Sequence, residues 1–402
     1  MNYKSFLFAA ILIFSQFSFS QDLISDPSLD ENIIKKASVV STHPFGIFFS
    51  RWQGNFQTKP LGDQNMSVNL ESSNVWSPLV TAYIPNNSED RNFVSQYPWH
   101  NREFRVDVDT LDAQTLEVQN DGVIKGLRIN LNLPINSKSE LKVGIRSFLL
   151  TGGKFPFSIL TSDDTIEYFH ENIAGGEDPF DRQLYPLNEA QIRYKDRNNR
   201  VMNINKGDFI LSGFELSYYR YPKEILKGFD FNYGAHIGIN TTKYNASLDL
   251  GASLNIMKGF QLKNKRSFDI GLSIGSTKNN LVDFQDDNMD FSNNTFLGYL
   301  ETIIQYSFLS KSKKVRHSFG ADFYVQTSLN KKSEFDYLIP TKNGTSFKSW
   351  NSGTSNLYNN NNYWTLMYSF TRKMTTTFYI QQDFTVNNNP DIQTGISVSF
   401  GI

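Results

Sequence analysis

The last residues of the chain alternate strictly between apolar and polar side chains. From Ile396 to Ile402 each even-numbered residue is apolar, and each odd-numbered residue is small or polar. A period of two is typical of a β-strand with one apolar and one polar face. The same alternation recurs upstream in segments of roughly ten residues, the length that a tilted strand needs to cross a bilayer. A chain of this kind must bury many apolar strand faces or expose them to lipid.

The first residues have the pattern of a secretion signal. Lys4 precedes an apolar run from Phe6 to Phe14, and Ser18 and Ser20 place small residues before a cleavage site. The run is too short to span about 30 Å of hydrocarbon. We therefore predict a cleaved signal peptide at 1–20, followed by a single exported domain at 21–402.

Composition narrows the possible classes further. The chain has no Cys, which excludes disulfides and thiolate metal sites. A formal net charge of −1 argues against a nucleic-acid partner. No second apolar run reaches the length of a membrane helix. The 34 Phe and 19 Tyr fit the aromatic girdles of a membrane β-barrel.

Twelve segments carry the alternating pattern, and the connections between them sort by length. The predicted strands cover about 66–76, 123–133, 141–149, 210–218, 229–239, 246–256, 265–278, 295–308, 314–328, 362–371, 374–385 and 392–402. Every second connection is short, and the connections between these include the longest, at 81–121, 151–206 and 329–361, although those at 241–243 and 386–391 are also short. Outer-membrane barrels have short periplasmic turns and longer outer loops. The sequence thus predicts an all-β, antiparallel transmembrane barrel of about twelve strands in the outer membrane of a Gram-negative cell.

Two segments have additional predicted roles. The final strand presents Ile396, Val398, Phe400 and Ile402 to outer-membrane lipids, and it fits the signal read by the barrel-insertion machinery. Residues 44–57 are apolar enough for a strand, yet they fit equally well as a segment placed in the barrel mouth. The sequence leaves that choice open.

The 151–206 connection is longer than a passive loop requires. It combines acidic residues with aromatic ones, and Thr165–Ile173 is predicted to form a short helix. The connection either folds into the mouth, where it narrows a pore or holds a ligand, or forms an ordered surface loop pinned by its own aromatics. Its candidate binding or constriction residues are Asp164, Glu167, His170 and Arg182.

A set of short motifs accompanies this connection. They are Gly152-Gly153, Asp164, Ile166, Phe169-His170, Asp181-Arg182, Tyr194-Lys195-Asp196 and Gly207-Asp208, with Asn74 and Asp121-Gly122 upstream. Over about 65–220 the sequence resembles an uncharacterised bacterial outer-membrane family known only as a domain of unknown function. Residues 158–163 depart from the more apolar run expected there. That family has no assigned activity, so the resemblance implies the barrel fold and no mechanism.

Polar residues on the strands supply further candidates. Arg128, Arg146 and His236 are predicted to line the lumen as ligand-binding or constriction residues. Further predicted lumen residues are Asp230, Asp249 and Asp269. The mixed signs predict weak ion selectivity.

The sequence supplies little evidence for metal or catalytic chemistry. His170 with Glu167 and Glu171 is too small a set for a metal site, and Asp286, Asn288 and Asp290 lack the Gly and Glu that complete a calcium loop. We expect no metal and no cofactor, and no catalytic residue can be assigned. The favoured function is a small-solute pore narrowed by 151–206. The alternatives are a closed structural or ligand-binding barrel, and a lipid-modifying enzyme with Ser, His and an acid at the rim.

Overall fold

The computed structural model describes most of the chain after residue 43. The described residues are 34–36, 44–85, 113–158, 160–172, 188–223, 226–312, 314–331, 361–383 and 392–402. The predicted signal peptide and the residues 332–360 of the third predicted long loop lie outside them. Among the described residues, no helix has the length and apolar character needed to cross a membrane.

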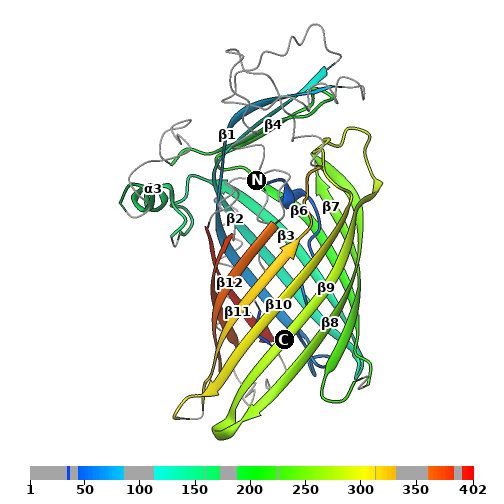
Figure 1. The fold of residues 1–402 in the computed structure, drawn as a ribbon, viewed down its shortest axis with the longest axis vertical. Helices are drawn as coiled ribbons and strands as arrows, with labels where there is room; N and C mark the ends of the chain where they lie inside the picture. Colours follow the sequence, from blue (N-terminus) through cyan, green and yellow to red (C-terminus); the bar gives the residue numbers. More distant parts are fainter. Residues whose placement is uncertain are drawn as a thin grey trace, which may run out of the picture.

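Twelve antiparallel strands form one closed barrel (Figure 1). Consecutive strands pair with each other, and β1 closes the sheet by pairing with β14 in the register Val68 to Val398. The wall strands are β1 (Asn65–Pro85), β2 (Ala113–Asn136), β3 (Ser139–Thr151), β6 (Phe209–Arg220), β7 (Asp230–Thr242), β8 (Asn245–Leu262), β9 (Arg266–Asp283), β10 (Phe296–Leu309), β11 (Arg316–Gln326), β12 (Asn361–Thr371), β13 (Thr375–Asp383) and β14 (Ile392–Gly401). The predicted fold class and strand count are confirmed.

The two ends of the barrel differ in their connections. One end, called the turn end, holds the short connections and both ends of the wall, Asn65 and Gly401. It lies at the bottom of Figure 1. The other end, called the loop end, holds the long connections together with the short β7–β8 turn. There β1 and β2 continue beyond the other strands and stay paired as far as Pro85 and Ala113, so their connection is shorter than the predicted loop 81–121.

The long β3–β6 connection has secondary structure of its own. Helix α3 (Asp163–Asn172) falls close to the predicted helix and lies to one side of the barrel axis in Figure 1. Strands β4 (Gln191–Lys195) and β5 (Val201–Asn205) form a hairpin that extends the sheet from the outer part of β2.

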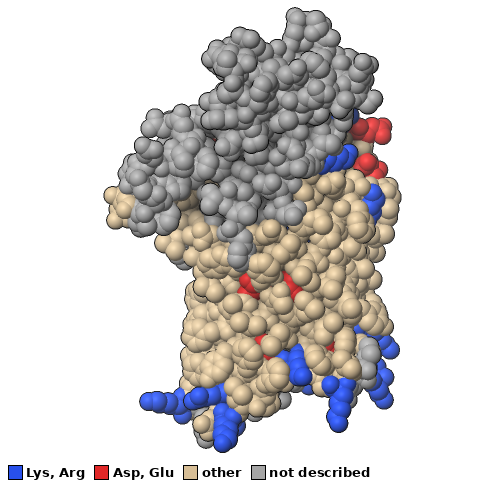
Figure 2. Space-filling model, viewed as in Figure 1, with Lys and Arg blue, Asp and Glu red and all other residues tan. Residues whose placement is uncertain are grey.

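The barrel wall is apolar on the outside and polar on the inside. In β7 the buried residues include Asn232, His236 and Asn240, whereas Ile237 is 42% exposed and Ile239 is 41% exposed. A soluble barrel would show the reverse order, because it must bury its apolar faces. Lys and Arg gather around the turn end (Figure 2). This inverted pattern is that of a transmembrane barrel.

Candidate functional site

Residues 44–57, called the plug, lie inside the barrel. The plug begins with a short 3-10 helix, η1 (Pro44–Phe48), and continues as an extended chain toward the turn end. Its side chains and main chain contact inward-facing residues of β3, β6, β7, β8 and β10. The choice that the sequence left open is thereby settled, because these residues fill the lumen and do not join the wall.

Polar side chains of the wall bind the main chain of the plug. Four plug N–H groups donate to them: Ser50 to Asp249 at 2.8 Å, Arg51 to Glu215 at 3.0 Å, Gly54 to Glu301 at 2.6 Å and Asn55 to Asn255 at 3.0 Å. Plug carbonyls accept from others: Phe48 from Asn245 at 2.9 Å, Phe49 from Arg146 at 2.6 Å, and Asn55 and Gln57 from Asn232 at 2.8 Å each. A buried chain without sheet partners needs such substitutes, because unpaired backbone groups are costly.

Glu215 is the centre of a buried ionic cluster in the middle of the lumen. Its carboxylate lies 3.2 Å from Arg128 and 3.0 Å from Arg146, and it also accepts the plug N–H of Arg51. The sequence analysis predicts that both arginines line the lumen, but it does not include Glu215. Glu215 alternates with Phe214 and Leu216, so its inward direction was readable from the strand pattern.

His236 is held between the wall and the plug. Its Nδ1 lies 2.8 Å from the Ser217 hydroxyl, and its Nε2 lies 2.9 Å from the Ser253 hydroxyl. The indole of Trp52 stacks on the imidazole with ring centroids 5.2 Å apart. Both ring nitrogens are engaged and the ring is covered, so the geometry is that of a packing and hydrogen-bonding contact.

Glycines in the wall make room for the plug. A Cβ atom added at Gly238 would lie 1.8 Å from the Ser50 hydroxyl. One added at Gly251 would lie 2.6 Å from the Trp52 ring. Glycine therefore allows the plug to approach the strand backbone closely at these two positions.

A second set of charged contacts holds the plug against β10, β11 and β12. The Arg51 guanidinium lies 4.7 Å from the ring centroid of Tyr324 and 5.1 Å from that of Tyr363, and it donates to the Tyr363 hydroxyl. Lys36, which precedes the plug in the sequence, forms ion pairs with Glu301 and Asp322. These contacts join the N-terminal segment to the side of the lumen opposite Glu215.

An apolar cluster lies at the loop end and includes the first residues of the plug. It is called the mouth cluster here and centres on Phe291, which lies in the β9–β10 connection. Phe45 and Phe48 of the plug pack on Phe291 at 5.2 Å and 5.1 Å, and Tyr194 of β4 stacks on it at 5.8 Å. The cluster also includes the buried residues Ile47, Phe49, Ile192, Met202, Ile204 and Met289. Burial raises the pKa of Tyr194 well above its usual value, and its hydroxyl donates to the Asp290 carbonyl at 2.7 Å.

The described part of the 151–206 connection reaches the mouth through its β4–β5 hairpin. Its β4–β5 hairpin contributes Tyr194 and its neighbours to the mouth cluster, whereas Asp164 lies on α3 and pairs with Lys154 at 2.6 Å. That hydrogen bond holds the pKa of Asp164 below its ordinary value. The side chains of Glu167, His170 and Arg182 lie outside the described residues. Within the described residues the plug narrows the lumen, and the predicted constriction by 151–206 stays a prediction.

The remaining predicted polar residues have structural partners. Asp249 binds Ser50 of the plug, and the buried Asp269 accepts from Ser267 at 3.1 Å, whereas Asp230 is exposed where β7 begins. In the β9–β10 connection the Asn288 amide donates to the Ala246 carbonyl at 3.1 Å. Among the described residues, no group of three His, Cys, Asp or Glu side chains is arranged to hold a metal ion.

Comparisons with known proteins give structural likeness only. No family model and no curated protein matches the sequence. An outer membrane channel from Pseudomonas putida F1 is 9% identical, with a TM-score of 0.39 over 85% of this chain and 96% of that chain. The NanC porin is 7% identical, with a TM-score of 0.34 over 83% of this chain and 100% of that chain. The toluene transporter TodX of P. putida is 8% identical, with a TM-score of 0.27 over 85% of this chain and 91% of that chain.

Proposed function

We propose that this chain is an outer-membrane channel closed in its resting state by its own plug, residues 44–57, and opened when the plug is displaced. The turn end is then the periplasmic end and the loop end faces outward, since outer-membrane barrels carry their longer loops outside. The apolar belt, with residues such as Leu254 at 43% exposure, supports a position in lipid.

The observation that carries this proposal is the way in which the plug is held. Strand pairing closes the barrel through β1 and β14, and the plug is a member of no strand in that sheet. Side chains bind it instead, and the oxygens of Asp249, Glu215, Glu301 and Asn255 accept hydrogen bonds from its main-chain N–H groups. Removal of the plug would expose these polar side chains to water, where they remain hydrated, and would break no hydrogen bond between wall strands. The wall is therefore suited to an open state as well as a closed one.

Single-channel conductance in planar bilayers tests the proposal. We expect the intact protein to give no steady current and a variant lacking residues 44–57 to give steady, uniform steps. A deletion of Asp163–Asn172 in α3 serves as the control and should stay silent, because this helix lies beside the lumen. Steady current through the intact protein would contradict a plugged resting state. Silence of the plug deletion, once its barrel is shown to be folded, would favour a closed binding barrel.

A further inference from the structure

The lumen contains a cavity of about 280 Å³ beside the second half of the plug. Its lining extends from Arg51 and Glu215 in the middle of the barrel to Asn65 and Gly401 at the turn end. This volume is close to the lower limit of ligand pockets, roughly 300 Å³. The cavity, called the chamber here, therefore has room for a small solute and not for a polymer.

The chamber is strongly basic. Its lining contains one acidic residue, Glu215, and six basic residues: Lys35, Lys36, Arg51, Arg128, Lys142 and Lys373. Glu215 is already shared between Arg128 and Arg146, and Lys36 already pairs with Glu301 and Asp322. Low-dielectric walls concentrate the field of such a charge set and attract ions of the opposite sign.

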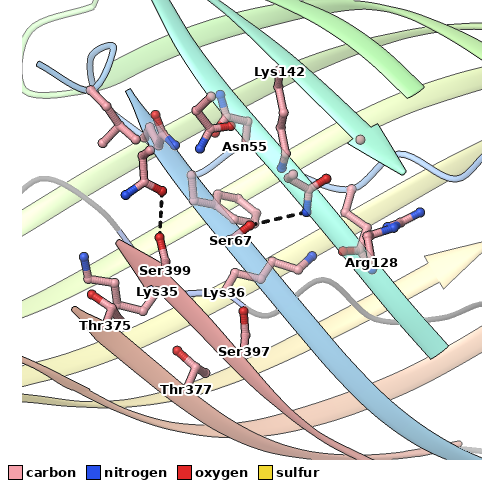
Figure 3. A pocket seen from close by; sticks show the side chains of 18 of the residues that line it. Lys35, Lys36, Asn55, Ser67, Arg128, Lys142, Thr375, Thr377, Ser397 and Ser399 are labelled. Atoms are coloured by element: carbon pink, nitrogen blue, oxygen red, sulfur yellow. Dashed lines mark hydrogen bonds between the residues drawn. The ribbon is translucent and has the colours of Figure 1, made fainter. Parts of the chain in front are cut away.

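Among the described residues, Lys142 lacks the hydrogen-bond partners that other inward-pointing basic residues of the wall have. Lys125 donates to the Ser72 hydroxyl at 2.6 Å and to the Gly153 carbonyl at 2.9 Å, and Arg316 donates to Ser267 at 3.0 Å. Lys142 is half-buried on β3 and makes no hydrogen bond or ion pair with any described residue. Its side chain extends into the chamber in Figure 3. An ammonium group in this position has its hydrogen-bond donors available to a ligand.

Hydroxyl and amide groups complete the lining. Asn130 donates to Ser67, and Ser399 donates to Asn65, at the side of the chamber formed by β1, β2 and β14 (Figure 3). Further hydroxyl groups come from Ser217, Thr375, Thr377 and Ser397. These groups can donate to and accept from hydroxyl groups of a ligand.

We propose that the chamber binds a small hydroxylated anion, such as a sugar acid or a sugar phosphate, with Lys142 on its carboxylate or phosphate group. This inference deepens the proposed function, since it names the class of solute that the channel admits. Binding is nevertheless measurable on the closed barrel, so its outcome is distinct from that of the conductance experiment.

Calorimetric titration of the intact protein in detergent tests this site. The probes are glucuronate, glucose 6-phosphate and neutral glucose, and we expect saturable binding of one or both anions and none of glucose. The two anions distinguish a carboxylate site from a phosphate site. Lys142→Gln should weaken binding about tenfold or more, because it removes a hydrogen bond between charged groups.

Two further variants make the titration decisive. Lys138→Gln changes an exposed lysine in the neighbouring β2–β3 turn and should leave binding unchanged. Lys142→Arg keeps the charge and should restore most of the affinity lost in Lys142→Gln. Equal binding of glucose and the anions, no binding of either anion, or equal effects of Lys142→Gln and Lys138→Gln would each overturn the proposal.

Discussion

The two ends of the lumen are built by different means. At the loop end the first residues of the plug belong to the mouth cluster, where rings of η1 and β4 pack on Phe291 of the β9–β10 connection. At the turn end the plug borders a chamber lined by basic and hydroxyl side chains. Apolar packing excludes water, whereas a polar lining retains it. From this contrast we expect the lumen to be less accessible from the side of its long loops than from the side of its short turns.

Between these ends the plug depends on individual polar contacts. Its main chain is bound by side chains that are distant in sequence, such as Asp249, which is 199 residues from Ser50. The seal, the polar contacts and the chamber can therefore be altered separately, and the predictions below are ordered by expected effect.

Loss of the central carboxylate should have one of the largest effects. Glu215→Gln removes the charge that compensates Arg128 and Arg146, and breaking a buried ion pair costs about 3–5 kcal/mol. Unfolding in urea, followed by circular dichroism, measures this loss. The control is Glu189→Gln, which alters an exposed pair with Lys206 and should cost less than about 1 kcal/mol. Equal costs for both variants would show that Glu215 does not organise the lumen.

Truncation in the mouth cluster should have a comparable effect that is confined to the loop end. Phe291→Ala removes the ring on which the plug and β4 pack, and such truncations of buried Phe cost about 3–5 kcal/mol. Phe284→Ala in the same connection alters a side chain that is 55% exposed and should change stability little. We expect brief openings in bilayer recordings of Phe291→Ala alone. A silent Phe291→Ala barrel would mean that the mouth cluster does not form the seal.

A methyl group added to the wall beside the plug should destabilise the packing of the plug, at a smaller cost than the two variants above. Gly251→Ala places a Cβ 2.6 Å from the Trp52 ring, and overpacking of this kind costs about 1–3 kcal/mol. At Gly298 the nearest atoms are 3.9 Å away, so Gly298→Ala is a matched control in another strand. Tryptophan fluorescence should shift in the first variant and stay constant in the second. Identical spectra would contradict the close contact between wall and plug.

Loss of the ion pair between Lys154 and Asp164 of α3 should have the smallest effect. Lys154→Gln removes the partner of Asp164, so the pKa of that carboxyl should rise toward its ordinary value. A depressed pKa stabilises the fold above the unfolded-state pKa, and this contribution disappears as pH falls through the folded-state pKa. Because both side chains are exposed, neither conductance nor stability at neutral pH should change. A change in conductance would indicate that α3, as part of the 151–206 connection, contributes to the constriction.

The sequence was a good guide to the barrel and a poor guide to what fills it. Strand pairing in a membrane barrel imposes a period of two, so the twelve strands and the alternation of short and long connections were readable from residues such as those of β7 and β14. The inward direction of Arg128, Arg146 and His236 followed from the same rule.

The plug was not predictable by that rule. Residues 44–57 have apolar side chains compatible with a strand, and their actual partners are contributed one by one from distant strands. The sequence pattern of a polar strand face is the same whether the face borders water or a buried chain. The plug could therefore not be predicted from Glu215 and Glu301, which bind it. The roles of the final strand in lipid contact and barrel insertion remain predictions.

Cysteine accessibility tests the difference between the two ends most directly. The native chain contains no Cys, so each single variant reports one position. Ser397 lines the chamber, whereas Ser50 is buried in the plug beneath the mouth cluster. In the folded barrel a charged maleimide should label Ser397→Cys readily and should label Ser50→Cys only after unfolding. Labelling of Ser50→Cys at the rate of Ser397→Cys would contradict a lumen sealed at its loop end.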